Sequence, residues 1–316
     1  MKRISYLLLF LSISVFGQER ITENVKFKSG KHTITGILVK PNIQGKLPAV
    51  VFQQGSGNFS FDGYETEAWG PHKFYIEDVL LKNGYAILYC NKRGLGGSSG
   101  NWRKNSFEGR ATDANAAVTY LQSREDILTS KIGISGHSQG GWIAQLAASN
   151  NKEIAFVIAL AGPTVGVNEQ MLKFIEHNYK CKGIYGKKLA RKLRKAQRSR
   201  NFSAFVGRVF PFIGGAKHWS LIKDYKPHEA ISKLTCPTLL LFGEYDAHVD
   251  PKESISRLKS LFNGNVPENF DVRIMQKGQH GFYEVNDPCT DWETATQQPF
   301  SNNFKNEIDT WVKALK

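Results

Sequence analysis

Residues 131–142 read Lys-Ile-Gly-Ile-Ser-Gly-His-Ser-Gln-Gly-Gly-Trp and place a serine where it could act as a nucleophile. An apolar run precedes Gly136 and an alanine-rich run follows Trp142, so Ser138 lies in a Gly-x-Ser-x-Gly turn between a predicted strand and a predicted helix. Side chains at both glycines would clash with those elements. The helix would also direct backbone N–H groups at an oxyanion on the serine. The pattern predicts a nucleophilic Ser138. The alternative, an ordinary glycine-rich turn, does not require this context.

A serine needs a base to activate it. His280 is the strongest candidate because it follows the last predicted strand between two glycines, on a loop that could reach Ser138. His248 is the rival base, but it stands beside the candidate acid and is expected on a surface loop. His137 precedes the serine, so its side chain is expected to point away from the serine's position and to pack locally.

The base in turn needs an orienting acid, and two aspartates compete for this role. Asp250 stands directly before Pro251, which is typical of a helix N-cap followed by proline at the first helical position. That structural role accounts for Asp250 fully. Asp246 lies four residues beyond the strand that ends at Phe242 and has no such role. The sequence therefore favours Asp246 as the acid.

The elements that must position these residues alternate between strands and helices. Continuous apolar strands are typical of a mainly parallel sheet covered by helices on both faces, where ligands bind at the carboxyl ends of the strands. A half-exposed hairpin is expected at the sheet edge. The expected strands are 24–28, 32–40, 48–52, 85–90, 132–136, 154–161, 237–242 and 270–275, and the expected helices are 71–83, 107–124, 142–148, 251–261 and 304–314.

The alternation stops from about residue 167 to 225, which predicts a helical cap inserted after the sixth strand. Between His177 and Lys223 there are 13 lysines and arginines and no aspartate or glutamate. One interpretation is a solvated helix that keeps the protein soluble. The other is that the charge draws an anionic substrate or a lipid surface towards a site lined by phenylalanines. Nucleic acid is not expected, because no recognition motif accompanies the charge. The phenylalanines are Phe202, Phe205, Phe210 and Phe212.

The first 17 residues are typical of a secretory signal peptide: two cations precede an uncharged run, Ile4–Gly17, that is short for a membrane span. Cleavage would leave Gln18 first and lower the formal charge from +14 to +12. We expect an exported protein, periplasmic or secreted, with one domain over 18–316. An uncleaved anchor is the alternative.

Four cysteines are too few for a disulfide scaffold, but export permits a bridge. Cys90 and Cys236 adjoin buried strands that should lie several strands apart, so they should not pair. Cys181 in the cap and Cys289 after the histidine loop both belong to the upper face of the sheet. We hypothesise that they form a bridge between cap and core; two free thiols are the alternative.

The sequence predicts no metal site and no cofactor. The histidines are scattered, and no cysteines stand at zinc-ligand spacing. The glycine-rich loop 91–100 follows a strand but lacks the helix and acidic partner of a dinucleotide site. Arg93 in this loop either orders loops over the site by hydrogen bonding or is a surface cation, and it is not expected to be catalytic.

The chain order Ser138, Asp246, His280 is that of the α/β-hydrolase fold. The sequence resembles this family from its first hairpin to its last helix. The stretches that carry the resemblance are Gly-His-Ser-Gln-Gly-Gly at the serine, Gly-Glu-Tyr-Asp at the acid and Asn-Lys-Arg-Gly-Leu-Gly-Gly-Ser after strand four. The Gly162-Pro163 step, the helical insertion and the following Asp224-Tyr-Lys-Pro look like the dienelactone hydrolase and acyl-peptidase-like esterase branch.

The resemblance implies an oxyanion hole. Segment 54–56 occupies the family's His-Gly-x motif, so the N–H of Ser56 would pair with that of Gln139. The chain departs from the motif at Gln54, where histidine is common, and this puts the loop conformation in doubt more than the backbone donors. An ordinary turn over 53–57 is the alternative.

The sequence therefore predicts an exported serine hydrolase that cleaves a carboxylic ester or thioester through an acyl-enzyme. The expected partner is a small-molecule ester, with an anionic one as an option. A peptidase or amidase on the same fold, and a catalytically silent binding protein, are the alternatives; the complete triad weighs against silence. One fold hosts many substrates, so the resemblance does not select the acyl or alcohol group.

Overall fold

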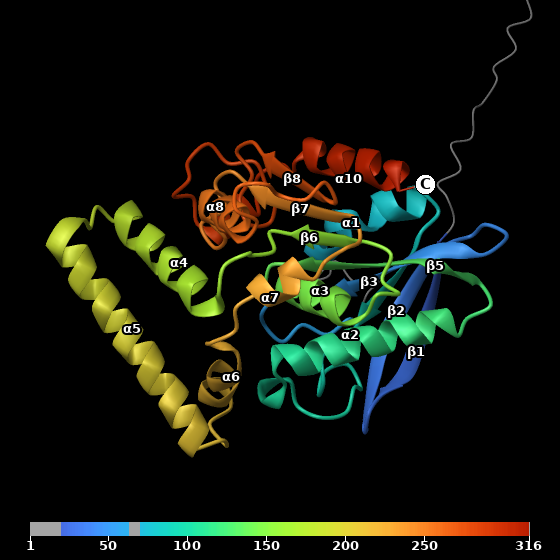
Figure 1. Cartoon of the computed structure of the whole chain (residues 1–316), viewed down its shortest axis with the longest axis horizontal. Coiled ribbons are helices and arrows are strands. Elements are labelled where there is room, and N and C mark those ends of the chain that lie inside the picture. Colours follow the sequence, from blue (N-terminus) through green and yellow to red (C-terminus); the bar gives the residue numbers. More distant parts are fainter. Residues whose placement is uncertain (1–19, 63–69, 316) are drawn as a thin grey trace, which may run out of the picture.

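An eight-stranded sheet forms the centre of the protein (Figure 1), in the strand order β1-β2-β4-β3-β5-β6-β7-β8. The computed structural model describes residues 20–62 and 70–315, with only the backbone for 70–75, so the predicted signal peptide lies outside the described residues. The strands are β1 (Arg20–Ser29), β2 (His32–Pro41), β3 (Leu47–Gln53), β4 (Ala86–Cys90), β5 (Ile127–His137), β6 (Val157–Leu160), β7 (Thr238–Gly243) and β8 (Phe270–Met275).

The sheet is antiparallel at one edge and parallel elsewhere. The edge strand β1 buries Val25 and Phe27 and exposes Lys26 between them, and it pairs antiparallel with β2. Strand β2 pairs antiparallel with β4, and all later pairs from β4 to β8 are parallel. Strands β6 and β7 are buried throughout. The predicted edge hairpin and mainly parallel sheet are confirmed.

Helices cover both faces of the sheet (Figure 1). Helices α1 (Gly70–Lys82) and α10 (Asn302–Ala314) cover one face, where Leu80 and Ile308 pack in one apolar cluster. On the other face, α2 (Phe107–Gln122), α3 (Gln139–Asn150), α7 (His228–Ser232) and α8 (Pro251–Leu261) join a second cluster that includes Val118 and Ile143. The short helices η2 (Trp102–Lys104) and α9 (Trp292–Ala295) span too few residues to show a helical period.

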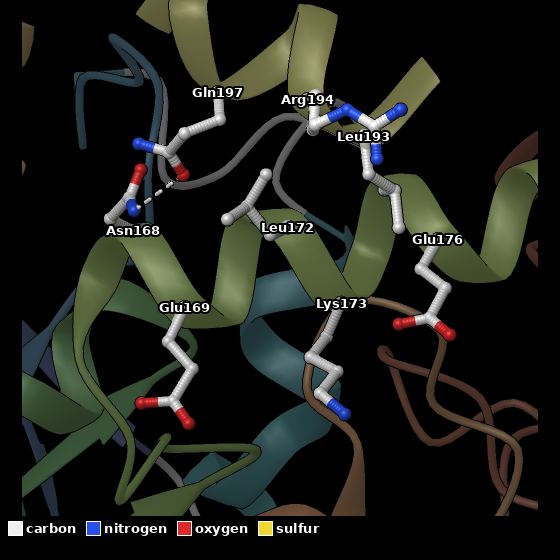
Figure 2. A pocket seen from close by; sticks show the side chains of 8 residues that line it. All are labelled: Asn168, Glu169, Leu172, Lys173, Glu176, Leu193, Arg194 and Gln197. Carbon is white, nitrogen blue, oxygen red and sulfur yellow. Dashed lines mark hydrogen bonds between the residues drawn. The ribbon is translucent and has the colours of Figure 1, made fainter. Parts of the chain in front are cut away.

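Four helices lie between β6 and β7, and the first three are α4 (Val167–Cys181), α5 (Gly186–Val209) and α6 (Gly214–Ile222). We call these first three helices the helical insertion. Figure 1 shows it extending to one side of the sheet, and Figure 2 shows the pairing of α4 with α5. Leu172 and Leu193 lie between these two helices, and Asn168 donates a hydrogen bond of 3.0 Å to Gln197. A surface pocket of about 430 Å³ lies in this seam.

Phe202, Phe205, Phe210 and Phe212 do not line the pocket that contains Ser138, contrary to the expectation from sequence. Phe202, Phe205 and Phe212 are 67%, 59% and 78% exposed, so they lie on the outside of the protein. Helix α5 instead packs on α4 and α6, and the residues that it buries are Leu189, Ala204 and Gly207. Among the helices that the structure describes, none combines the length and apolar character that crossing a membrane requires.

Candidate functional site

The turn at Ser138 has the geometry that its sequence predicts. Ser138 caps α3 with φ 55° and ψ −120°, a strained conformation for a residue with a side chain. Its N–H donates to the Leu160 carbonyl of β6 at 2.8 Å, which anchors the turn to the sheet. A Cβ at Gly136 would lie 2.1 Å from the Gly140 carbonyl oxygen, and one at Gly140 would lie 2.0 Å from that of Gln53. Both positions therefore require glycine.

His280 and Asp246 are brought together from the loops that follow β8 and β7. His280 Nδ1 lies 2.8 Å from Asp246 Oδ2, and both side chains are buried. The other carboxylate oxygen of Asp246 accepts hydrogen bonds of 2.8 Å from the backbone N–H groups of His248 and Val249. The carboxylate is thus fixed on one side by its own loop and presents its second oxygen to the imidazole.

Asp250 has the structural role that its sequence context predicts. Its side chain accepts hydrogen bonds from the N–H groups of Lys252 and Glu253 and caps α8, with Pro251 in the first turn. The structure therefore places Asp246, and not Asp250, against the imidazole.

Burial determines the protonation of the pair. It lowers the pKa of His280 well below the usual value, so the imidazole is neutral at neutral pH. Burial raises the pKa of Asp246, and the neighbouring His248 and the backbone donors at Val249 and His248 oppose this rise. Because Nδ1 faces the carboxylate, it carries the proton, and Nε2 of His280 is left as an acceptor.

Ser138 and His280 line one pocket of about 710 Å³. In the described part of the chain no hydrogen bond joins Ser138 Oγ to His280, and such contacts often tighten only when substrate is bound. The helical insertion forms part of the wall, so the pocket lies between the insertion and the sheet. The aromatic lining includes Trp102, Trp142, Phe174, Trp219 and Trp292.

Two further histidines occupy places that the sequence did not predict. His248 is not on the surface: its ring lies in the pocket between Phe174 and His280, with centroids 4.1 and 4.6 Å away. His137 does not pack only locally, because its Nε2 donates to the His280 carbonyl at 2.9 Å across 143 residues of sequence. Neighbouring strand ends create both contacts, and local sequence carries no signal for them.

The backbone beside the serine has the groups needed for an oxyanion hole. Ser56 and Gln139 both line the pocket. A Cβ at Gly55 would lie 3.4 Å from Ser138 Cβ, so the loop after β3 runs directly alongside the serine turn. Among the described residues, neither the N–H of Ser56 nor that of Gln139 has a hydrogen-bond partner.

Two buried basic side chains, neither of which the sequence singled out, hold these donor segments in place. Lys92 Nζ donates to the carbonyls of Gly55 and Gly57 at 2.6 and 2.8 Å. Arg110 joins the two segments, because it donates to the Gln54 carbonyl at 2.8 Å and to Gln139 Oε1 at 2.6 Å. A signal for Arg110 was present: it stands at helical spacing from the buried residues Ala114, Ala117 and Leu121.

Arg93 is not a free surface cation. It makes a bidentate ion pair with Asp113 of α2, with two nitrogen–oxygen distances of 2.8 Å. Ser29 and Asn105 also donate to this carboxylate. Arg93 therefore fastens the glycine-rich loop to α2 and does not line the pocket.

Within the described residues, two groups of side chains lie close enough to hold a metal ion: Asp246 with His248 and His280, and His177 with Cys181 and Cys289. Hydrogen bonds already engage Asp246 and Nδ1 of His280, and the two cysteines are joined to each other. That the protein uses no metal or cofactor stays a prediction.

Cys181 and Cys289 form a disulfide, which confirms the hypothesised bridge. Their Cα atoms are 5.6 Å apart, and His177 Nε2 reinforces the junction by donating to the Pro288 carbonyl at 3.0 Å. Cys90 and Cys236 are free, as expected. The bridge ties the end of α4 to the segment after His280, so it restrains one wall of the pocket.

Reducing this disulfide is expected to lower the melting temperature by several degrees, because the bridge closes a loop of 108 residues and such cross-links contribute about 2–4 kcal/mol. The measurement is thermal unfolding with and without dithiothreitol. A Cys181→Ala, Cys289→Ala double variant should melt near the reduced wild type and ignore the reductant. Cys236→Ala, which removes a free thiol, should still show the full drop in melting temperature when dithiothreitol is added. If the reductant no longer lowered the melting temperature of Cys236→Ala, the assignment of the disulfide would be contradicted.

Comparisons with known proteins agree with this architecture. The chain is 26% identical to esterase EstD of Thermotoga maritima over 283 residues, which cover 88% of this chain and 65% of EstD. The esterase PF2001 of Pyrococcus furiosus has a similar structure, with a TM-score of 0.61, 17% identity and coverage of 93% of this chain and 91% of that one. Est1E of Butyrivibrio proteoclasticus, solved with ferulic acid bound, gives a TM-score of 0.58 at 17% identity. The match covers 92% of this chain and 98% of Est1E.

These structural likenesses, together with the strand order of the sheet, show that the chain has the α/β-hydrolase fold. The sequence profile of the BD-FAE family matches residues 36–261, which run from β2 through the serine turn and the helical insertion to the end of α8. The chain belongs to the BD-FAE family of α/β hydrolases.

Proposed function

We propose that the protein is a serine hydrolase that cleaves carboxylic esters, or the related thioesters, of small molecules. The observation that carries the proposal is the meeting, in one pocket, of a strained serine at a helix start and a neutral histidine bonded to a buried aspartate. This pairing of a nucleophile with an oriented base is the arrangement that acyl transfer requires.

In the proposed reaction, His280 Nε2 takes the proton of Ser138 Oγ as the oxygen attacks the ester carbonyl. The N–H groups of Ser56 and Gln139 donate to the oxyanion. His280 then protonates the departing alcohol and leaves an acyl group on Ser138. A water molecule, activated by the same imidazole, releases the acid. Asp246 keeps Nδ1 protonated and stabilises the imidazolium in both halves of the reaction.

The relatives and the pocket support an ester as the substrate. EstD and PF2001 are named esterases, and Est1E binds ferulic acid, a small aromatic acid. The pocket of this chain is of the size that small ligands occupy, and its wall is rich in indole rings. An ester with an apolar or aromatic part suits this wall.

The test of the proposal is covalent labelling by a fluorophosphonate probe, which reacts with activated serines. The folded wild type should be labelled at Ser138, and heat-unfolded protein should not. Hydrolysis of an ester panel with graded acyl length would then define the preferred chain. A folded protein that neither reacts with the probe nor hydrolyses any ester would overturn the proposal.

Lys92→Met is expected to lower kcat at least tenfold with little change in KM. The carbonyl of Gly55 and the N–H of Ser56 belong to one planar peptide unit and point in opposite directions, so Lys92 fixes the donor by holding the carbonyl. Steady-state kinetics on a neutral ester measures the effect. Lys46→Met, which removes an exposed cation, is the control. A rise in KM alone would show that Lys92 shapes the pocket without ordering the donor.

We also propose that the protein is exported with loss of residues 1–17. The disulfide supports this, because such bonds persist in oxidising compartments. N-terminal sequencing of the protein from periplasm or medium should begin at Gln18. A chain that stays in the cytoplasm with Met1 intact would contradict the proposal.

A further inference from the structure

Arg200 differs from the other cations of α5. Arg194 and Arg198 are exposed, whereas Arg200 is partly buried and lines the same pocket as Ser138. Its guanidinium lies 3.7 Å above the ring of Trp219. The indole N–H of Trp219 donates to the Arg200 carbonyl at 2.9 Å. Trp219 therefore contacts both the backbone and the guanidinium of Arg200.

No carboxylate of the described residues pairs with the charge of Arg200. Its Nε and Nη2 are enclosed, and among the described residues neither has a hydrogen-bond acceptor or a carboxylate in ion-pair contact. No aspartate or glutamate lines the pocket among those residues. Burial lowers the pKa of Arg200, but a guanidinium remains protonated at neutral pH. A partly buried charge without an acceptor is costly, and Arg200 lines the pocket, so a ligand there could supply the acceptor.

A second residue of the same wall also has an enclosed polar atom. Within the described parts of the chain, Nδ1 of His218 has no hydrogen-bond partner, and the ring packs edge-on against Trp102, with 5.2 Å between the centroids. Burial, together with the positive charges of Arg110, Lys92 and Arg103, lowers the pKa of His218 to about 4, so the ring is neutral at neutral pH. Arg200 is therefore the fixed cation of this aromatic wall, and the neutral His218 offers a further polar contact.

We propose that Arg200 binds a carboxylate of the substrate, so that the ester cleaved at Ser138 carries a free carboxylate elsewhere in the molecule. This inference rests on the proposed ester hydrolysis. A carboxylate is planar and matches the fork of donors on a guanidinium, and the flat indole face behind Arg200 keeps that fork oriented. The exposed cations of α5 attract anions at long range, whereas Arg200 would select among them inside the pocket.

The experiment compares two p-nitrophenyl esters of equal chain length, the anionic hydrogen glutarate and the neutral valerate. In 0.5 M NaCl, which screens distant charges, Arg200→Met should lower kcat/KM on the glutarate ester at least tenfold and on the valerate ester less than twofold. Arg198→Met, an exposed cation on the same helix, should change neither by twofold. Arg200→Lys, which keeps charge without the fork, should recover only part of the loss.

A direct binding measurement accompanies the kinetics. Free glutarate should raise the melting temperature of the wild type and of Arg198→Met, but not of Arg200→Met. Equal losses on both esters, or no loss on the glutarate ester together with an unchanged glutarate shift, would overturn the inference. If neither ester is hydrolysed and the fluorophosphonate probe does not react, the proposed function fails, and the glutarate shift alone decides whether Arg200 binds carboxylates.

Discussion

Ser138→Ala is expected to lower kcat on a neutral p-nitrophenyl ester by at least about four orders of magnitude, and His280→Ala by a similar factor. Each removes one member of a unit in which nucleophile and base act together, so combining them should cost little more than either alone. The melting temperature of Ser138→Ala should stay near that of the wild type, since alanine replaces serine at the same positive φ. Single-turnover and steady-state kinetics measure the loss.

Ser56→Ala is the matched control for this prediction. It removes an exposed hydroxyl from the same pocket but keeps the backbone N–H that would hold the oxyanion, so activity should fall less than fivefold. Retention of more than a hundredth of wild-type kcat in purified Ser138→Ala would disprove its role as nucleophile.

The second large effect is expected at the acid. Asp246→Asn should lower kcat by about three to four orders of magnitude, because an amide can donate to Nδ1 of His280 and favour the tautomer whose Nε2 cannot accept a proton. Asp250→Ala should instead cost about 1 kcal/mol of stability by removing the N-cap of α8, with kcat little changed. Urea unfolding and ester kinetics on both variants separate the two effects.

The opposite result, in which Asp250→Ala abolishes turnover and Asp246→Asn does not, would refute the assignment of the acid. If Asp246→Asn unfolds, the result shows that the carboxylate is needed for stability, because it accepts two backbone N–H groups of its own loop. Asp246→Glu, which keeps the charge and lengthens the side chain, then replaces Asp246→Asn in the kinetic comparison.

The serine turn and the order of elements could be predicted because their signals are local. Glycines two residues either side of Ser138 and a proline after Asp250 each report on backbone geometry within a few residues. The pairing of Asp246 with His280 followed from placing both after parallel strands, where carboxyl ends meet at one edge.

Contacts between distant segments could not be predicted in this way. The role of Lys92 can be recognised only once the loop after β3 is known to pass beside it. The contact of His137 can be recognised only once the loop after β8 is placed. Phe202 was expected to line the site but is exposed. A single apolar residue on an inserted helix does not indicate which side of that helix faces the core.

The position of the helical insertion has a consequence for how this protein can diversify. The proposed catalytic groups come from loops after β3, β5, β7 and β8, whereas Arg200, His218 and Trp219 come from one unbroken stretch between β6 and β7. A single recombination event could therefore exchange the substrate-facing wall and leave the reacting groups in register. The disulfide adds one condition, since an incoming wall must either carry a cysteine that reaches Cys289 or leave that thiol unpaired.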